Sequence, residues 1–321
     1  MTDIEQSLFQ DEWMQKPCFA VCLAAFNGVA FMADQIRSIL EQQHVSVQLF
    51  ISVDQSSDGT EERLTEWAKT ESRLTLLSTG QRFGGAGPNF YRLLREVDLT
   101  GFDYLCFADQ DDLWHSEKLW RACQLMRLQV AAGYSSNFTA FWPSGRERFV
   151  NKAWPQREWD YLFESAGPGC TYVLDRGLAL AVQALVRGAD GKLLRIDFHD
   201  WLVYAFARSR HYTWIIDDWP SLKYRQHSQN QIGVNAGWQA FRLRVQKILN
   251  GYGFEQSCLI ADVIGVSSLP IVQRGLLGGR SGCLWLALQA RACRRKPLDQ
   301  LWFFLSCVAL ALRKPLAKGG A

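Results

Sequence analysis

No C-x-x-C pair occurs among the nine cysteines of this 321-residue chain. An odd count, with several cysteines inside apolar segments, argues against a disulfide framework or a zinc site and predicts buried, reduced thiols in a cytosolic protein. The first residues, Met1–Gln6, are polar and acidic, which predicts no signal peptide. The longest apolar run, Leu301–Leu312, is too short to cross a bilayer. Internal repeats are also lacking, which excludes a repeat architecture.

Acidic residues are scarce near the C-terminus. Residues 238–321 carry twelve Lys and Arg against three acids, which is a net charge of +9. Because the whole chain carries +3, the first 237 residues carry −6. A mildly acidic body with a basic tail suggests a polyanionic partner for the tail, such as a membrane surface or a nucleic acid. No nucleic-acid recognition motif accompanies the charge, so no nucleic-acid partner is expected.

The apolar content of 48% predicts an ordered globular protein with a large core and a smaller second unit. Strand-length apolar runs alternate with helical spacing up to residue 130, which favours an α/β fold with a mainly parallel sheet between helices. Beyond Gly133 the sequence becomes irregular and aromatic, and a helical, basic extension is expected from Trp238. The expected strands are residues 18–26, 47–54, 74–78, 102–108, 170–174, 214–217 and 220–225, and the expected helices include 31–42, 60–69 with Thr60 as N-cap, 88–96, 116–130 and 176–186.

Three carboxylates follow the apolar run 102–108 within four positions, at Asp109, Asp111 and Asp112. If the backbone is still extended there, Asp109 and Asp111 point to the same face. Like charges about 4 Å apart repel by roughly 4 kcal/mol at an effective dielectric near 20, so this cluster favours a cation. Hard oxygen ligands suit Mg²⁺ or Mn²⁺ beside a substrate phosphate. The alternative is a helix N-terminus capped by Asp111 or Asp112.

A set of motifs follows one order along residues 17–235, and that order resembles family 2 glycosyltransferases of the GT-A fold. More narrowly, it resembles the bacterial rhamnosyltransferase-like branch. Any one motif is weak and the ordered set is specific. The chain departs from many relatives at Val53, where they carry a second acid, and at Gln55, where they carry glycine. The motifs are Leu23–Gly28, Ser52–Thr60, Asn89-Phe90, Asp109–Trp114, Gly169–Thr171, His199–Trp201 and Tyr224–Gly233.

The resemblance implies a nucleotide-sugar donor, and it places the nucleotide at the ends of the first two strands. An acid such as Asp54 can accept from a pyrimidine N–H, although it can also cap the following turn. Asp58 is expected to shape the loop, and Asp109 is expected to share the donor diphosphate with the metal. The donor-binding residues that the resemblance implies are Ala25, Asn27, Asp54, Asp58, Asn89 and Asp109.

The resemblance further assigns a divalent metal to Asp109, Asp111 and His227, and the catalytic base to Asp200. The base takes the proton of the acceptor hydroxyl as that hydroxyl attacks the anomeric carbon. The alternative for Asp200 is a first-turn acid of a helix. The neighbouring His199 stands where the wider family has Glu, and we do not expect it to be the base. The acceptor or diphosphate side is expected to comprise Trp114, His199, Trp201, Arg225 and His227, with packing as the alternative for Trp114.

We therefore expect a polar lead-in over residues 1–16, a catalytic domain over 17–235 and a helical basic extension over 236–321. The catalytic domain would divide into a nucleotide-sugar half (17–112) and an acceptor half (113–235). The resemblance implies transfer of a deoxysugar, L-rhamnose from a dTDP donor, to a lipid-linked surface-polysaccharide acceptor at the inner face of the membrane. The extension would bind that membrane or cap the catalytic domain. The alternatives are another UDP- or GDP-sugar donor, or a non-catalytic protein that binds a nucleotide sugar or glycan.

Overall fold

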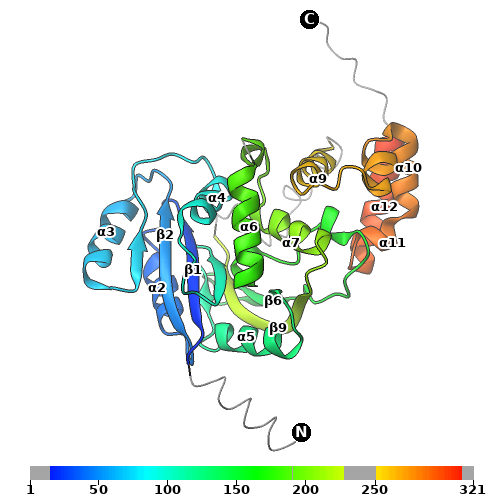
Figure 1. Ribbon diagram of the computed structural model, residues 1–321. Coiled ribbons are helices and arrows are strands. Elements are labelled where there is room, and N and C mark those ends of the chain that lie inside the picture. The colour runs from blue at the N-terminus through cyan, green and yellow to red at the C-terminus, as the bar shows by residue number, and fades with distance from the viewer. Residues whose placement is uncertain (1–14, 190, 228–250, 313–321) are drawn as a thin grey trace, which may run out of the picture. The chain divides into compact units, whose positions relative to one another are not determined.

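The computed structural model describes residues 15–189, 191–227 and 251–312 (Figure 1). The chain forms two compact units, and each is built from three stretches of sequence. We call them the sheet unit and the helical unit. The predicted domain boundary at residue 235 lies outside the described residues. The sheet unit comprises Met1–Ala153, Gly167–Gly188 and Tyr212–Gln229, and the helical unit comprises Trp154–Ala166, Ala189–His211 and Asn230–Ala321.

The first half of the sheet is parallel, as predicted. Its strands run in the order β3-β2-β1-β4, and the middle strand β1 is buried along its length between β2 and β4. A strand covered on both faces needs apolar residues at every position, which explains its continuous apolar sequence. The strands are β1 (Cys18–Ala25), β2 (Ser46–Val53), β3 (Leu74–Leu76) and β4 (Tyr104–Ala108), and the helices of this half are α2 (Met32–Leu40), α3 (Thr60–Thr70) and α4 (Ala86–Glu96).

The second half of the sheet is mixed, so the predicted parallel arrangement holds only for the first half. Strand β8 (Val173–Asp175) runs antiparallel to β4 and to β6 (Gly133–Phe141). β9 (Trp214–Arg225) runs parallel to β6 and antiparallel to the short β5 (Leu113–Trp114). β7 (Glu147–Val150) pairs with β6. Within the described residues the nine strands have the order β3-β2-β1-β4-β8-β6-β9-β5, with β7 off this path, and the remaining elements of the unit are α5 (Lys118–Leu128), η2 (Gly169–Thr171) and α6 (Arg176–Gly188).

The irregular sequence directly after Gly133 was not predicted to form a strand, but residues 133–141 form β6 inside the sheet. Its polar residues are buried, and they bond to the neighbouring strand. The Ser136 hydroxyl donates to the Ser221 hydroxyl over 2.6 Å, and Asn137 Nδ2 donates to the Asp218 carbonyl over 2.8 Å. Buried polar groups are stable when they are paired in this way. Because polar residues occupy buried positions of this strand, its sequence lacks the apolar pattern by which a buried strand is recognised. The two short strands expected at 214–217 and 220–225 are likewise one strand, β9, with register shifts opposite Asn137.

The helical unit contains the helical extension predicted beyond residue 238, as far as it is described. Close packing there depends on glycine. A Cβ at Gly282 in α10 would lie 2.4 Å from the Gly275 carbonyl oxygen, so any larger residue would push α10 away from η4. The elements are η1 (Asp160–Leu162), η3 (Lys192–Arg195), α7 (His199–Ser209), α9 (Tyr252–Val263), the π-helix η4 (Ile271–Leu276), α10 (Gly279–Leu288), α11 (Ala290–Cys293) and α12 (Pro297–Leu312).

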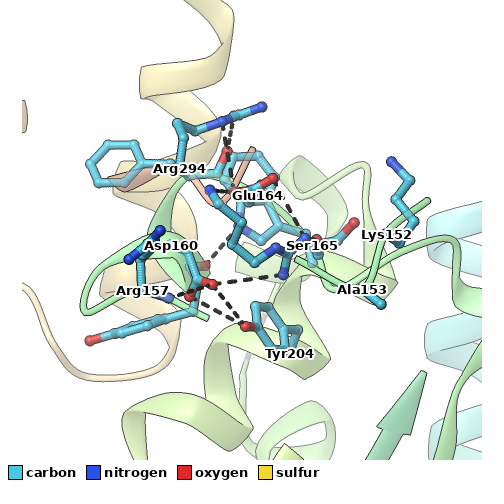
Figure 2. Close-up of polar contacts among 12 residues, drawn as sticks. Lys152, Ala153, Arg157, Asp160, Glu164, Ser165, Tyr204 and Arg294 are labelled. Atoms are coloured by element: carbon cyan, nitrogen blue, oxygen red, sulfur yellow. Dashed lines mark hydrogen bonds and ion pairs between the residues drawn. The ribbon is translucent and has the colours of Figure 1, made fainter. Parts of the chain in front are cut away.

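A buried ion network joins three segments of the helical unit (Figure 2). Asp160 is fully buried, and its carboxylate accepts from Arg208 over 3.0 Å and lies 3.8 Å from Arg295. Tyr204 also donates to this carboxylate, and Arg295 continues the network to Glu164 at 3.5 Å. Burial raises the pKa of Asp160, and the two guanidinium charges oppose that rise. The network connects η1, α7 and the segment before α12.

The basic cluster at residues 294–296 is therefore not simply a solvated basic face. Arg295 is only 3% exposed and is held by Asp160 and Glu164. Arg294 donates to the Phe163 carbonyl over 2.8 Å. Two of the charges that suggested a membrane-binding tail instead stabilise the packing of the tail on residues 157–165.

Candidate active site

The acid loop, residues 109–112, follows the end of β4 at Ala108. The backbone bends at Gln110 and Asp111, so the condition for a shared face of Asp109 and Asp111 is not met. Asp109 instead groups with Asp112 and Cys170, with one ligand atom of each within 4.8 Å of the others. Asp111 turns to the chain after β9, where its Oδ2 lies 2.7 Å from His227 Nε2. Asp109 and Asp111 therefore have different protein partners, and both lie close enough to Asp112 to raise its pKa.

Asp112 is the most constrained of these acids. It is fully buried, and its pKa lies well above the ordinary value because of burial first and the charges of Asp109 and Asp111 second. Its Oδ1 accepts from the Arg225 N–H over 3.4 Å, and the Cys170 thiol also forms a hydrogen bond with the carboxylate. A buried carboxylate beside further acids and a thiol, with one ligand atom of Asp109, Asp112 and Cys170 within 4.8 Å of the others, fits a divalent cation that takes hard oxygen ligands. The loop is therefore a candidate acidic metal site.

The end of β9 and the residues after it bring Arg225 and His227 to the acid loop. Arg225 Nε donates to the Asp111 carbonyl over 2.9 Å, and its guanidinium lies 3.5 Å from Asp34. The ring of His227 stacks on Phe31 with centroids 4.6 Å apart. The pairing of β9 with β5, directly after the acid loop, causes this meeting. The structure thus brings together Asp111, Arg225 and His227, which the sequence predicted on the metal and diphosphate side.

Gln110 joins the acid loop to the loop after β1, and sequence reasoning missed it. Its Oε1 accepts from the Phe26 N–H and its Nε2 donates to the Phe26 carbonyl, both over 2.8 Å. A Cβ at Gly28 would lie 2.1 Å from Gln110 Oε1, so a larger residue there would displace the Gln110 amide from its two hydrogen bonds. Two local features could have pointed to this contact, namely the Asn27-Gly28 turn and the position of Gln110 between Asp109 and Asp111. The contact itself was not predictable, because Phe26 and Gln110 are 84 positions apart.

Three predicted donor-site residues gather at the carboxyl ends of β1 and β2. Asp54 is 4% exposed, and its carboxylate oxygens accept from the Phe83 and Gly84 N–H groups over 2.7 and 2.8 Å. Asn89 Nδ2 donates to the Ser52 carbonyl over 3.1 Å and approaches the Ala25 carbonyl at 3.4 Å. Asp54 therefore holds the glycine-rich loop 80–87 against the strand ends. Its contact with a nucleobase stays a prediction.

Asn27 and Asp58 shape the adjoining loop. Asn27 has a positive φ of 46°, and its Oδ1 accepts from the Ser57 N–H over 2.8 Å. Asp58 accepts from the N–H groups of Thr60 and Val29, each over 3.1 Å. Thr60 is the first residue of α3 and Gly59, with φ 88°, is its N-cap, so the prediction of Thr60 as N-cap was wrong. Glycine adopts a φ of this sign readily, so Gly59 can take the N-cap position. The helix therefore begins one residue earlier than predicted, and Thr60 lies inside it.

Trp114 is packed inside the sheet unit. It is 5% exposed, pairs with Leu222 of β9 and lies under the Lys118 ammonium, 3.6 Å from the ring centroid. A sugar contact would need an exposed ring face, so the structure favours the packing alternative. Lys118 is itself fully buried, and no hydrogen-bond acceptor for its Nζ is found among the described residues. Burial lowers the pKa of Lys118, whereas the nearby Asp112 charge opposes that effect.

The predicted base and its neighbours belong to the helical unit, in the first turn of α7. Asp200 Oδ1 accepts from the Trp201 N–H over 2.7 Å. Burial lowers the pKa of His199 to about 3, so this imidazole is neutral at ordinary pH. Trp201 is 8% exposed and donates from Nε1 to the Tyr161 carbonyl over 2.8 Å, so it packs within its own unit.

Helix α9 holds the segment that leads into α7. The buried Gln256 accepts from the Asp197 N–H over 3.1 Å and donates to the Arg195 carbonyl over 2.9 Å. The Tyr252 hydroxyl donates to the Asp197 carboxylate. These contacts fix the chain three to five positions before Asp200. Sequence reasoning missed them because the helix lies in the basic extension, about 55–60 positions away by these same contacts.

Comparison with known proteins shows the family of this chain. The family model "Glycosyl transferase family 2" matches residues 20–168. The dTDP-rhamnosyl transferase RfbG of Shigella flexneri is 38% identical over 287 residues, which cover 89% of this chain and 99% of that protein. The chain belongs to glycosyltransferase family 2. The family resemblance and its rhamnosyltransferase-like branch are confirmed, and the protein is a glycosyltransferase.

Solved structures share this fold. S. aureus TarS 1-349, in complex with UDP-GlcNAc, has a TM-score of 0.50 at 14% identity and covers 92% of this chain and 90% of that one. The mannosyltransferase PcManGT from Pyrobaculum calidifontis, in complex with GDP-Man and Mn2+, has a TM-score of 0.50 at 15% identity, with 96% and 92% covered. The GT-A-like α/β fold with a C-terminal helical region is thereby confirmed.

Proposed function

We propose that this family 2 glycosyltransferase moves L-rhamnose from a dTDP donor, with inversion, to a lipid-linked surface-polysaccharide acceptor of the O-antigen or capsule type. The observation that carries the proposal is the 38% identity to a protein named dTDP-rhamnosyl transferase across 99% of that protein's length. The acid loop supports a metal-dependent reaction. The gathering of Ala25, Asp54 and Asn89 at the carboxyl ends of β1 and β2 supports a nucleotide-sugar donor. The acceptor hydroxyl forms the new bond to the anomeric carbon as the bond to dTDP breaks.

Asp109, Asp111 and His227 would hold Mg²⁺ or Mn²⁺, and the buried Asp112 would complete the acidic surroundings. When bound, the ion stabilises negative charge on the leaving diphosphate. Arg225, held at the loop by the Asp111 carbonyl, can donate to the same diphosphate oxygens. The donor sugar would then lie beside the loop 80–87, which Asp54 holds through the backbone contacts described above.

Asp200 would act as the base. Its carboxylate would accept the proton of the acceptor hydroxyl, so that dTDP leaves as the anion and the proton stays on the protein until product release. His199 is buried and neutral, and we assign it to packing beside the base. The lipid-linked acceptor would place this step at the inner face of the cell membrane.

Thermal unfolding with dTDP, UDP and GDP, each with and without Mn²⁺, tests the donor and the metal. A ligand at 100 times its dissociation constant stabilises the folded chain by about 2.7 kcal/mol. We expect that shift with dTDP and Mn²⁺ together, and its loss in Asp111→Asn. The exposed Asp218→Asn of the same unit is the matched control and should keep the shift. A stronger shift with UDP or GDP would move the donor assignment to that nucleotide, and no shift with any nucleotide in a folded sample would refute nucleotide binding.

Gln256→Leu tests whether α9 positions the base. The change keeps the apolar part of the side chain and removes both hydrogen bonds to residues 195 and 197. Because small misplacements of reacting groups cost up to about a hundredfold in rate, we expect kcat to fall by about tenfold to a hundredfold at an unchanged donor KM. Glu255→Gln, on the same helix but exposed, should leave kcat within a factor of about two. Equal kcat values in the two variants would contradict the positioning role.

A further inference from the structure

Helix α12 has an apolar outer face. Its inner stripe, Phe303, Cys307 and Ala311, is buried, as expected for a helix that packs on its own unit. The opposite face should then be polar, but it carries exposed apolar side chains at helical spacing. Leu298, Leu301, Trp302, Leu305 and Leu312 are 52%, 53%, 47%, 45% and 77% exposed. A helix that is apolar all round is normally buried in a larger core or in lipid.

Helix α10 packs against α12 and also carries exposed apolar side chains (Figure 1). Its Leu284 and Leu288 are 49% and 77% exposed, one helical turn apart. Contiguous exposed apolar surface of this kind marks an interaction site on a globular protein, whereas scattered single residues do not. We call the exposed large apolar side chains of α10 and α12 the apolar face, and they comprise Leu284, Leu288, Leu298, Leu301, Trp302, Phe304, Leu305 and Leu312.

The sequence that contains the apolar face is strongly basic. From Ile264 to Ala321 the sequence has nine Lys and Arg against a single acid, Asp299. Two of the nine, Arg294 and Arg295, are held in the ion network, whereas Arg280 of α10 and Arg291 of α11 are exposed. Arg313, Lys314 and Lys318 follow α12 in the sequence. Within the described ranges, none of the helices has both the length and the apolar character needed to cross a membrane.

We propose that the apolar face of α10 and α12 docks on an anionic lipid bilayer, lying in its interface and not spanning it. Leucines would enter the acyl boundary, Trp302 would sit at the headgroup level, and the arginines would meet lipid phosphates. A second copy of the chain is the other candidate occupant. A face flanked by several cations and one acid would repel its own copy, so the charge favours lipid. The proposal does not depend on the donor assignment, because no nucleotide takes part in docking.

Vesicle flotation of the full chain, without nucleotide, tests the proposal. The vesicles are phosphatidylcholine alone or with about one-third phosphatidylglycerol. We expect flotation with the anionic vesicles that weakens as salt is raised. Leu301→Glu/Leu305→Glu should reduce the bound fraction about tenfold or more. Leu128→Glu/Val130→Glu adds the same charges at residues that are 70% and 86% exposed in the sheet unit, and it should bind as the wild type does.

Two further measurements separate a loss of lipid binding from a loss of folding. Circular dichroism must show that both double variants fold. If the α12 variant does not fold, the fluorescence difference between the wild type and Trp302→Phe decides, because brominated anionic lipid should quench Trp302 in a docked helix. No flotation of the folded wild type would overturn the proposal. So would a dimer in light scattering that Leu301→Glu/Leu305→Glu dissociates, because a second copy would then cover the face.

Discussion

Asp200→Asn should lower kcat by about 10²–10⁴-fold, which is the usual contribution of a positioned general base. The amide keeps the shape of the side chain and the bond from the Trp201 N–H, but it cannot take the proton of an attacking hydroxyl. The KM for the donor should stay the same, because donor binding is assigned to residues of the sheet unit. Turnover of dTDP-rhamnose with a lipid-linked acceptor measures the loss.

A binding measurement separates this effect from damage to the fold. Asp200→Asn should keep the metal-dependent thermal shift with dTDP, which Asp111→Asn should lose. Asp262→Asn, an exposed acid of the same unit, should leave kcat unchanged. If Asp200→Asn retained more than about a tenth of the wild-type kcat, another group would have to be the base.

Asp160→Asn should destabilise the helical unit by about 3–5 kcal/mol, the usual cost of removing one partner from a buried ion pair. The amide leaves Arg208 and Arg295 without their common counter-charge, and Arg295 is only 3% exposed. Urea unfolding followed by tryptophan fluorescence measures the change. Because the chain has two compact units, we expect the transition of the helical unit to move more than that of the sheet unit.

Asp262→Asn serves as the control for stability as well. Its ion pair with Lys192 has an N–O distance of 2.8 Å, but both side chains are more than half exposed. Exposed pairs contribute about 0.2–1 kcal/mol, so this variant should unfold near the wild type. If the two variants had equal unfolding free energies, the Asp160 network would be replaceable and the buried charges would not stabilise the unit.

The sequence predicted the parts of the fold that depend on local pattern. β1 and β4 are continuous apolar runs, β2 is largely apolar, and acids follow β2 and β4 directly, so both the strands and the acid loop were recognisable. The motif order then identified the family. The strand at 133–141 was missed, because its buried serines and Asn137 are stabilised by partners more than 80 positions away. No local window contains those partners.

The candidate site divides in the same way. Asp111 and His227 were both predicted as metal ligands from their motifs, together with Asp109, and they lie 2.7 Å apart in the structure. Gln110, Lys118 and Gln256 were missed. Each is significant only through contacts that the fold creates, namely an amide that spans two loops, an ammonium enclosed with a tryptophan, and an amide that fixes the approach to α7. Trp114 was ambiguous in sequence, because a tryptophan that stacks on a sugar and one that packs a core look the same there.

The ion network has a consequence for anyone who shortens this enzyme. A truncated chain that ends near residue 235 follows the motif boundary and resembles a catalytic module, but it would lack Arg294 and Arg295 and keep Asp160 and Glu164. It would carry a buried carboxylate whose counter-charges partly belonged to the discarded piece. Expression screens and domain exchanges among relatives should therefore keep or exchange residues 154–166, 189–211 and the C-terminal helices together. The extension is a structural part of the enzyme that cannot be removed as a tag is removed.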